Sequence, residues 1–74
     1  MNKKLPISSQ QIVDNVARAL GSVEAARLSD VQFEELKNLQ TEVIQLCSSG
    51  KEEDARRLEK LIENAVDEGP PESE

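Results

Sequence analysis

Hydrophobic residues recur every three or four positions over three stretches of the chain, which is the spacing of amphipathic α-helices. We therefore predict helices over residues 9–20, 30–48 and 51–67, and an all-α fold class. The apolar positions that carry the pattern are Ile12, Val13, Val16, Ala17 and Leu20; Phe33, Leu36, Leu39, Val43, Ile44, Leu46 and Cys47; and Ala55, Leu58, Leu61, Ile62, Ala65 and Val66.

Two places in the sequence carry the signature of a helix start. Ser8 and Gln11 stand at the spacing of a capping box, in which two side chains three residues apart bind each other's backbone N–H groups. This predicts that the first helix begins near Ser9. Ser29 and Gln32 repeat the signature before the second helix.

The connections between the helices contain residues that end helices. Gly21 follows the first helix, where a left-handed C-terminal cap is expected, and Gly50 follows the second. Residues 22–27 favour helix but are few, so we predict one or two turns there. The short link at Gly50 predicts an antiparallel hairpin of the second and third helices, with the first helix packed across it.

A chain of 74 residues forms one domain at most. Residues 1–7 are expected to be a flexible N-terminus and residues 8–67 the helical domain. Residues 68–74 combine two prolines with three acidic residues and show no periodicity, which predicts a disordered acidic tail.

The core of the helical domain is expected to be aliphatic and thin. Eighteen Leu, Ile and Val residues supply it, and Phe33 is the only aromatic residue. Burying each of them contributes about 2 kcal/mol, against an ordering cost of about 1.5 kcal/mol for every residue of the chain. A single cysteine and the absence of His exclude an internal disulfide and the usual zinc ligand sets, which leaves association with a second chain as a source of stability.

The net charge of −6 disfavours nucleic-acid binding, which depends on clustered Lys and Arg. No apolar run reaches the roughly 18 residues needed to cross a membrane, and the residues after Met1 lack the hydrophobic region of a signal peptide. The lone Cys47 fits a reducing compartment. These features predict a cytoplasmic protein with no nucleic-acid partner and no membrane partner.

Residues suited to catalysis are scarce. The chain has no His, no Tyr and one thiol, so we expect no enzymatic activity, no cofactor, no metal and no small-molecule substrate. Cys47 lies on the apolar stripe of the second helix, and we interpret it as a small buried residue. A redox role or an inter-subunit disulfide is the alternative.

The outer face of the third helix is charged. Its spacing pairs Glu52 with Arg56 and Glu53 with Arg57 across one helical turn. Because acidic residues surround the basic ones, a solvated surface is favoured there over a site for phosphate or for an acidic partner.

The apolar stripe of the second helix is the candidate interaction site. It is too wide for a single two-stranded contact, so we predict that Phe33, Leu36, Val43 and Ile44 bind a helix of another chain. The alternative is that the first and third helices cover the whole stripe.

Positions 55–62, Ala-Arg-Arg-Leu-Glu-Lys-Leu-Ile, resemble the second helix of the small hairpin phosphatases that act on phosphorylated sporulation regulators. The signature of that family reads Ser-Gln-Glu-Leu-Asp-x-Leu-Ile. Here alanine replaces the serine and Glu59 replaces the aspartate, so the activity of the family is not carried over. In size and character the chain is also similar to small helical chaperones of type III secretion.

The leading functional hypothesis is a small non-enzymatic regulator or adaptor that docks an apolar helical face on a protein partner, or on a second copy of itself as a homodimer. Two alternatives stay open. One is a small DNA-binding transcriptional regulator that reads DNA with the helices over 9–20 and 30–48. The other is a chaperone or inhibitor that masks a helix of a secreted or regulatory protein.

Overall fold

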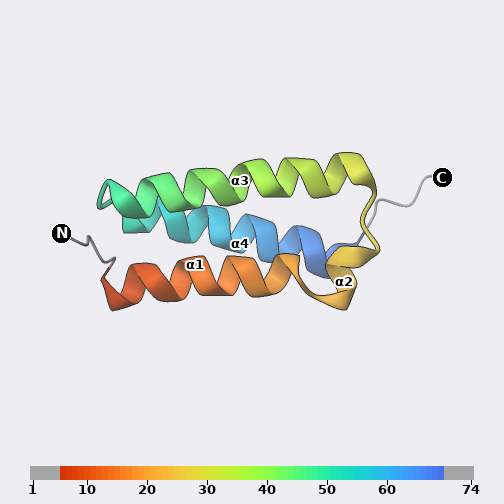
Figure 1. Cartoon of the computed structure of the whole chain (residues 1–74), viewed down its shortest axis with the longest axis horizontal. Helices are drawn as coiled ribbons and strands as arrows, with labels where there is room; N and C mark the ends of the chain where they lie inside the picture. The colour runs from red at the N-terminus through yellow and green to blue at the C-terminus, as the bar shows by residue number, and fades with distance from the viewer. Residues whose placement is uncertain (1–5, 70–74) are drawn as a thin grey trace.

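The computed structural model describes residues 6–69, and the regular structure in this range is α-helical (Figure 1). The elements are α1 (Ile7–Leu20), α2 (Val23–Ala26), α3 (Asp30–Ser48) and α4 (Glu52–Glu68). The all-α fold class is confirmed, and the three predicted helices correspond to α1, α3 and α4. Residues 22–27 contribute the single turn of α2, within the one or two turns predicted.

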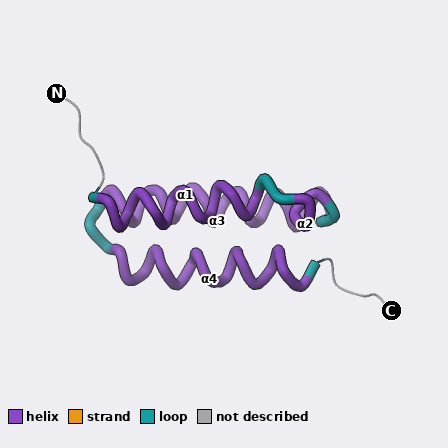
Figure 2. Tube along the Cα trace, turned by 90° about the horizontal axis from the view of Figure 1, so that it is seen from below, coloured by secondary structure: helices purple, strands orange, loops and turns teal. Residues whose placement is uncertain are grey.

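The three long helices form a small bundle. α3 and α4 run antiparallel and share the most extensive interface, which confirms the predicted hairpin. α1 packs along both helices of the hairpin and runs in the same direction as α4. Figure 2 shows α1 and α3 overlapping in one layer, with α4 in a second layer below them.

The start of α1 differs from the prediction. The helix begins at Ile7, with Pro6 as its N-cap, and no side chain caps it. The hydroxyls of Ser8 and Ser9 donate instead to the carboxylate of Glu52, at the start of α4. The predicted capping box at Ser8 is therefore wrong, because Pro6 is the N-cap and Ser8 is already the second residue of the helix, away from the position from which a side chain caps.

The end of α1 also differs from the prediction. Gly21 has a φ of −94°, and not the positive φ of a left-handed cap. The chain turns directly into α2, where the Ser22 hydroxyl accepts from the Ala25 N–H at 3.2 Å and donates to the Ala19 carbonyl at 2.7 Å. Ser22 thus joins the end of α1 to the start of α2, and the chain passes between them without a left-handed residue.

Both ends of α3 agree with the prediction. The Ser29 hydroxyl accepts from the Gln32 N–H at 3.2 Å, and the Gln32 side chain accepts from the Ser29 N–H at 3.3 Å, which completes the capping box. After Ser48 the chain leaves the helix through Gly50, whose φ of 80° suits a residue without a Cβ.

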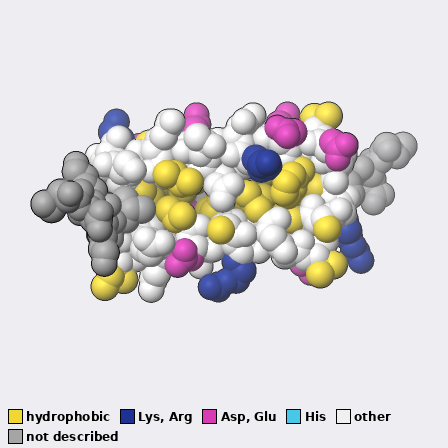
Figure 3. All heavy atoms as spheres, in the orientation of Figure 1, with side chains coloured by type: hydrophobic (Ala, Val, Ile, Leu, Met, Phe, Trp, Pro, Cys, Tyr) yellow, Lys and Arg dark blue, Asp and Glu magenta, His cyan; other side chains and the backbone are white. Residues whose placement is uncertain are grey.

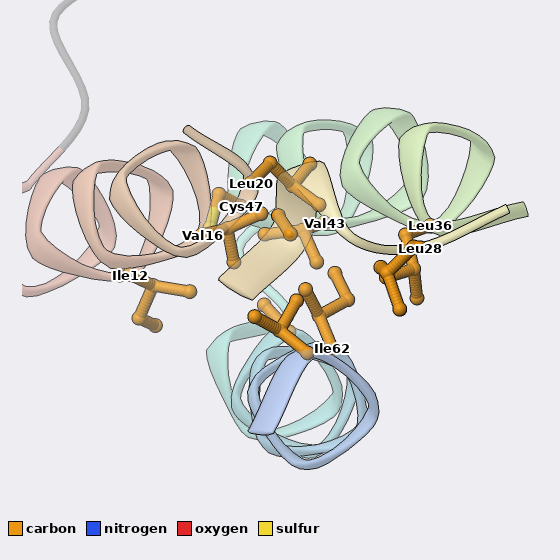
Figure 4. Packing of buried hydrophobic residues seen from close by; sticks show 11 residues of the cluster. Ile12, Val16, Leu20, Leu28, Leu36, Val43, Cys47 and Ile62 are labelled. Carbon is orange, nitrogen blue, oxygen red and sulfur yellow. The ribbon is translucent and has the colours of Figure 1, made fainter. Parts of the chain in front are cut away.

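The core lies between α1, α3 and α4, with side chains from these helices pointing toward one another (Figure 4). Its centre holds Val16, Val43 and Ile62, one from each long helix, and none of them has exposed surface. The other buried hydrophobic residues are Ile12, Leu20, Ala25, Leu28, Leu36, Cys47, Ala55 and Val66. Full burial of a Val or Ile side chain contributes about 2 kcal/mol, so these aliphatic contacts are the main source of stability.

The helices extend one residue beyond the predicted domain at each end, since Ile7 begins α1 and Glu68 ends α4. The flexibility predicted for residues 1–5 and for residues 70–74 concerns positions outside the described residues. Within 6–69, none of the helices combines the length and the apolar character needed to span a membrane.

Candidate functional site

The four residues predicted to bind a partner fall into two groups. Leu36 and Val43 are core residues, with 6% and 0% of their surface exposed. Phe33 is half-buried, and Ile44 is 41% exposed. Neighbouring helices cover the middle of the stripe, so Leu36 and Val43 pack in the bundle, and Phe33 and Ile44 are the two that reach the surface. That these residues bind a partner stays a prediction.

Phe33 and Ile44 lie on the flank of α3 that faces α1. Successive residues of an α-helix are about 100° apart, so both fall on one side of the line through the buried residues Leu36 and Val43. Cys47 is displaced from this line toward the same side, and its thiol lies 3.9 Å from the Ser9 carbonyl oxygen of α1, which identifies α1 as the neighbour there. Cys47 itself is buried, which confirms its interpretation as a small core residue.

α1 supplies the other half of this surface. Its flank with Asn15 is bonded to α4, so the opposite flank, with Val13 and Ala17, faces α3. Val13 packs on the core, and Ala17 is exposed. The surface formed by Val13, Ala17, Phe33 and Ile44 is termed the α1–α3 face. Figure 3 views the α1–α3 layer from the side away from α4 and shows hydrophobic side chains gathered along its middle.

The α1–α3 face carries little charge. Within about a third of a turn of the buried line, this flank of α3 holds one base and one acid, Lys37 and Asp30. The matching flank of α1 holds Gln10 and no charged residue. The Lys37 Nζ lies 5.9 Å from the centre of the Phe33 ring, in a cation–π arrangement. The face is thus apolar in the middle and close to neutral at its edge.

α1 and α4 are joined by polar contacts. The Ser8 and Ser9 hydroxyls donate to the Glu52 carboxylate, at 2.7 Å for Ser9. The Asn15 amide donates to the Glu59 carboxylate at 2.8 Å. Asn15 lies about two helical turns after Ser8 on α1, and Glu59 lies about two turns after Glu52 on α4. The equal spacing on the two helices is consistent with their parallel arrangement.

Two carboxyl groups of α4 have shifted pKa values. Hydrogen bonds from Ser8 and Ser9 lower the pKa of Glu52 below its ordinary value of 4.5, because they stabilise the charged form. Partial burial, followed by repulsion from Glu59, raises the pKa of Glu63 above that value, because both disfavour the charge. The pKa values of these two carboxyl groups are therefore shifted in opposite directions.

The ion pairs predicted on α4 are not formed. Glu52 is bonded to α1 and not to Arg56, and Glu53 does not reach Arg57. The ion pair found among residues 6–69 joins Arg57 to Asp54 at 3.9 Å. Because both side chains of that pair are largely exposed, it contributes little to stability, and the outer side of α4 is exposed as predicted.

The local sequence patterns do not predict the contacts between α1 and α4, although one signal points to them. Ser9 lies three residues before Ile12 and so occupies a position of the buried stripe of α1. A polar side chain in such a stripe requires a hydrogen-bond partner. Nothing near Ser9 in the sequence identifies Glu52 as that partner.

Comparisons with protein-family models, with curated proteins and with solved structures found no match for this chain. In the described part of the chain, no three His, Cys, Asp or Glu side chains are grouped so that they could hold a metal ion. We therefore infer function from the exposed surface of the fold.

Proposed function

We propose that this protein is a small non-enzymatic interaction module, a regulator or adaptor, that assembles as a homodimer through its α1–α3 face. The observation that supports this best is an apolar surface left open over a complete core. Phe33 and Ile44 are accessible, although Leu36 and Val43 of the same helix are buried. Apolar side chains gathered on one exposed face are typical of protein interfaces.

A second copy of the chain is the partner that suits this face. The net charge of −6 makes two copies repel each other over most of their surface. The α1–α3 face is an exception, because Lys37 and Asp30 balance there, so two copies can meet without bringing like charges together. A chain of this length also gains stability by association.

The chemistry of the chain supports binding as its role. It has no His and no Tyr, and its one thiol, that of Cys47, packs in the core. A free thiol suits the reducing cytoplasm, where we propose that the module acts.

The mass of the full chain in solution tests the homodimer. Light scattering during size-exclusion chromatography should give twice the chain mass of 8.2 kDa. Ile44→Lys should reduce the measured mass to that of one chain, because it places a charge in the apolar interface. Leu61→Lys is the matched control, since Leu61 is also a large exposed aliphatic residue but lies on α4.

A single-chain mass at every protein concentration would overturn the proposal. So would an Ile44→Lys variant that stays dimeric, or equal dissociation by both variants. Circular dichroism on each variant establishes that its helical content is unchanged, so that a loss of dimer reports on the interface.

A further inference from the structure

α4 presents different residues to its two neighbours. The flank that holds Glu52 and Glu59 is bonded to α1. The opposite flank holds Leu58, Leu61 and Ala65, at the three- and four-residue spacing of one helix side, and it lies toward α3. Leu61 is 55% exposed, so the bundle leaves this side of α4 partly uncovered.

The adjoining flank of α3 supplies Leu39 and Leu46, which are partly buried against the core. In an antiparallel hairpin, residues equally far from the turn lie at about the same level, and Leu39 and Leu61 are both eleven residues from Gly50. These four leucines form one surface, termed the α3–α4 face: Leu39, Leu46, Leu58 and Leu61.

Acidic residues border the α3–α4 face. Three exposed ones fall within about a third of a turn of the buried lines of their helices. They are Glu35 and Glu42 on α3, and Asp54 on α4. The bases nearby are Lys51, at the turn, and Arg57, which is already paired with Asp54 at 3.9 Å. This border therefore has an excess of negative charge that the α1–α3 face lacks.

We propose that the α3–α4 face binds an amphipathic helix of a partner protein, one whose apolar stripe is flanked by Lys and Arg. The leucines supply the apolar contact, and the acidic border attracts the flanking bases and speeds the encounter. The same border repels the phosphates of nucleic acid and of anionic lipids, so a basic protein helix is the occupant that fits.

This site is separate from the interface of the proposed homodimer, so the inference holds whether or not the chain dimerises. A dimer formed through the α1–α3 face leaves both copies of the α3–α4 face free. The module would then carry two identical binding sites for its partner.

A synthetic peptide tests the proposal. The probe is a helix of about four turns, with leucine along one side and lysine on the others. Added to the full-length protein, it should shift the backbone amide resonances around Leu39 and Leu61 and leave those around Phe33 and Ile44 in place. Raising the salt from about 0.02 M to about 0.5 M should weaken binding, because the border charges are exposed and become screened.

Two variants and one control peptide locate the site. Leu61→Lys should weaken binding about tenfold or more, whereas Ile44→Lys adds the same charge on the other flank of α3 and should bind as the wild type does. A peptide of the same composition in scrambled order should bind about tenfold more weakly, because it has no apolar stripe.

If the scrambled peptide bound as tightly as the amphipathic one, or if Leu61→Lys and Ile44→Lys weakened binding equally, binding would be a general attraction of basic peptides to an acidic chain. Either result would overturn the proposed site. Resonance shifts centred on Phe33 would do the same. Because Ile44→Lys tests the homodimer and Leu61→Lys tests the bound helix, the two proposals fail independently of each other.

Discussion

α4 is held on its two sides by different forces. Toward α3 it presents leucine side chains, and toward α1 it presents carboxylates that accept hydrogen bonds from Ser8, Ser9 and Asn15. Apolar packing is non-directional and tolerates small shifts along a helix, whereas a hydrogen bond requires its atoms at a defined distance and angle. The comparison indicates that the apolar core, to which all three long helices contribute, stabilises α4, and that the hydrogen bonds to α1 define its alignment.

The largest effect is expected from the apolar centre. Ile62 has no exposed surface, and Ile62→Ala leaves a cavity in the core. This variant should lower the free energy of unfolding by about 2–5 kcal/mol, measured by urea denaturation. If Ile62→Ala lowered the free energy of unfolding by less than Ser9→Ala does, the polar contacts with α1 would contribute more to stability than the apolar core, contrary to this expectation.

A smaller loss is expected on the polar side. Ser9 is 1% exposed, and Ser9→Ala removes one of the two hydroxyls that bind Glu52. The melting temperature should fall by roughly 4–8 °C in thermal unfolding. Ser49→Ala, at an exposed position after α3, is the control and should change it far less. Equal results for the two serines would mean that the buried hydroxyl does not help to hold α1.

The charge on Glu52 adds a pH dependence to the same contact. Because hydrogen bonds lower its folded-state pKa, ionised Glu52 stabilises the fold above the ordinary value of 4.5, and this contribution is lost as the pH falls through the lowered value. Glu52→Gln should therefore melt about 2–4 °C below the wild type at neutral pH. The gap should close in acid, and a gap that is independent of pH would contradict a role for the charge.

The smallest effect is expected from Glu63, with the opposite sign. Partial burial and repulsion from Glu59 raise its pKa above the ordinary value of 4.5. The ionised side chain therefore destabilises the fold at neutral pH, and this destabilisation is lost as the pH falls through the raised pKa. Glu63→Gln should raise the melting temperature by about 1 °C at neutral pH and have no effect in acid. A lower melting temperature would show that the ionised side chain makes a favourable contact.

The contrast between the starts of α1 and α3 shows how far a local signature can be trusted. Ser29 and Gln32 form their capping box, since every atom of that motif comes from adjacent residues. Ser8 stands at the same spacing from Gln11, yet its hydroxyl donates to Glu52, 44 residues away. A local motif thus forms only where the helix starts at the residue that the motif requires, and α1 starts two residues before the predicted start at Ser9.

The candidate interaction site shows a second limit. Periodicity assigns Phe33, Leu36, Val43 and Ile44 to one stripe, and it correctly marks that stripe as apolar. How much of the stripe is covered depends on where α1 and α4 lie against it. Leu36 and Val43 become core residues for this reason, while Ile44 stays exposed.

Periodicity and helix-ending residues are sufficient for the all-α class, the α3–α4 hairpin and the apolar faces, because these features depend on residues within a few positions of one another. The packed bundle alone decides that Ser8 and Ser9 bind Glu52, and that Phe33, Ile44 and Leu61 stay at the surface. These outcomes depend on distances between side chains on different helices, which no local pattern contains.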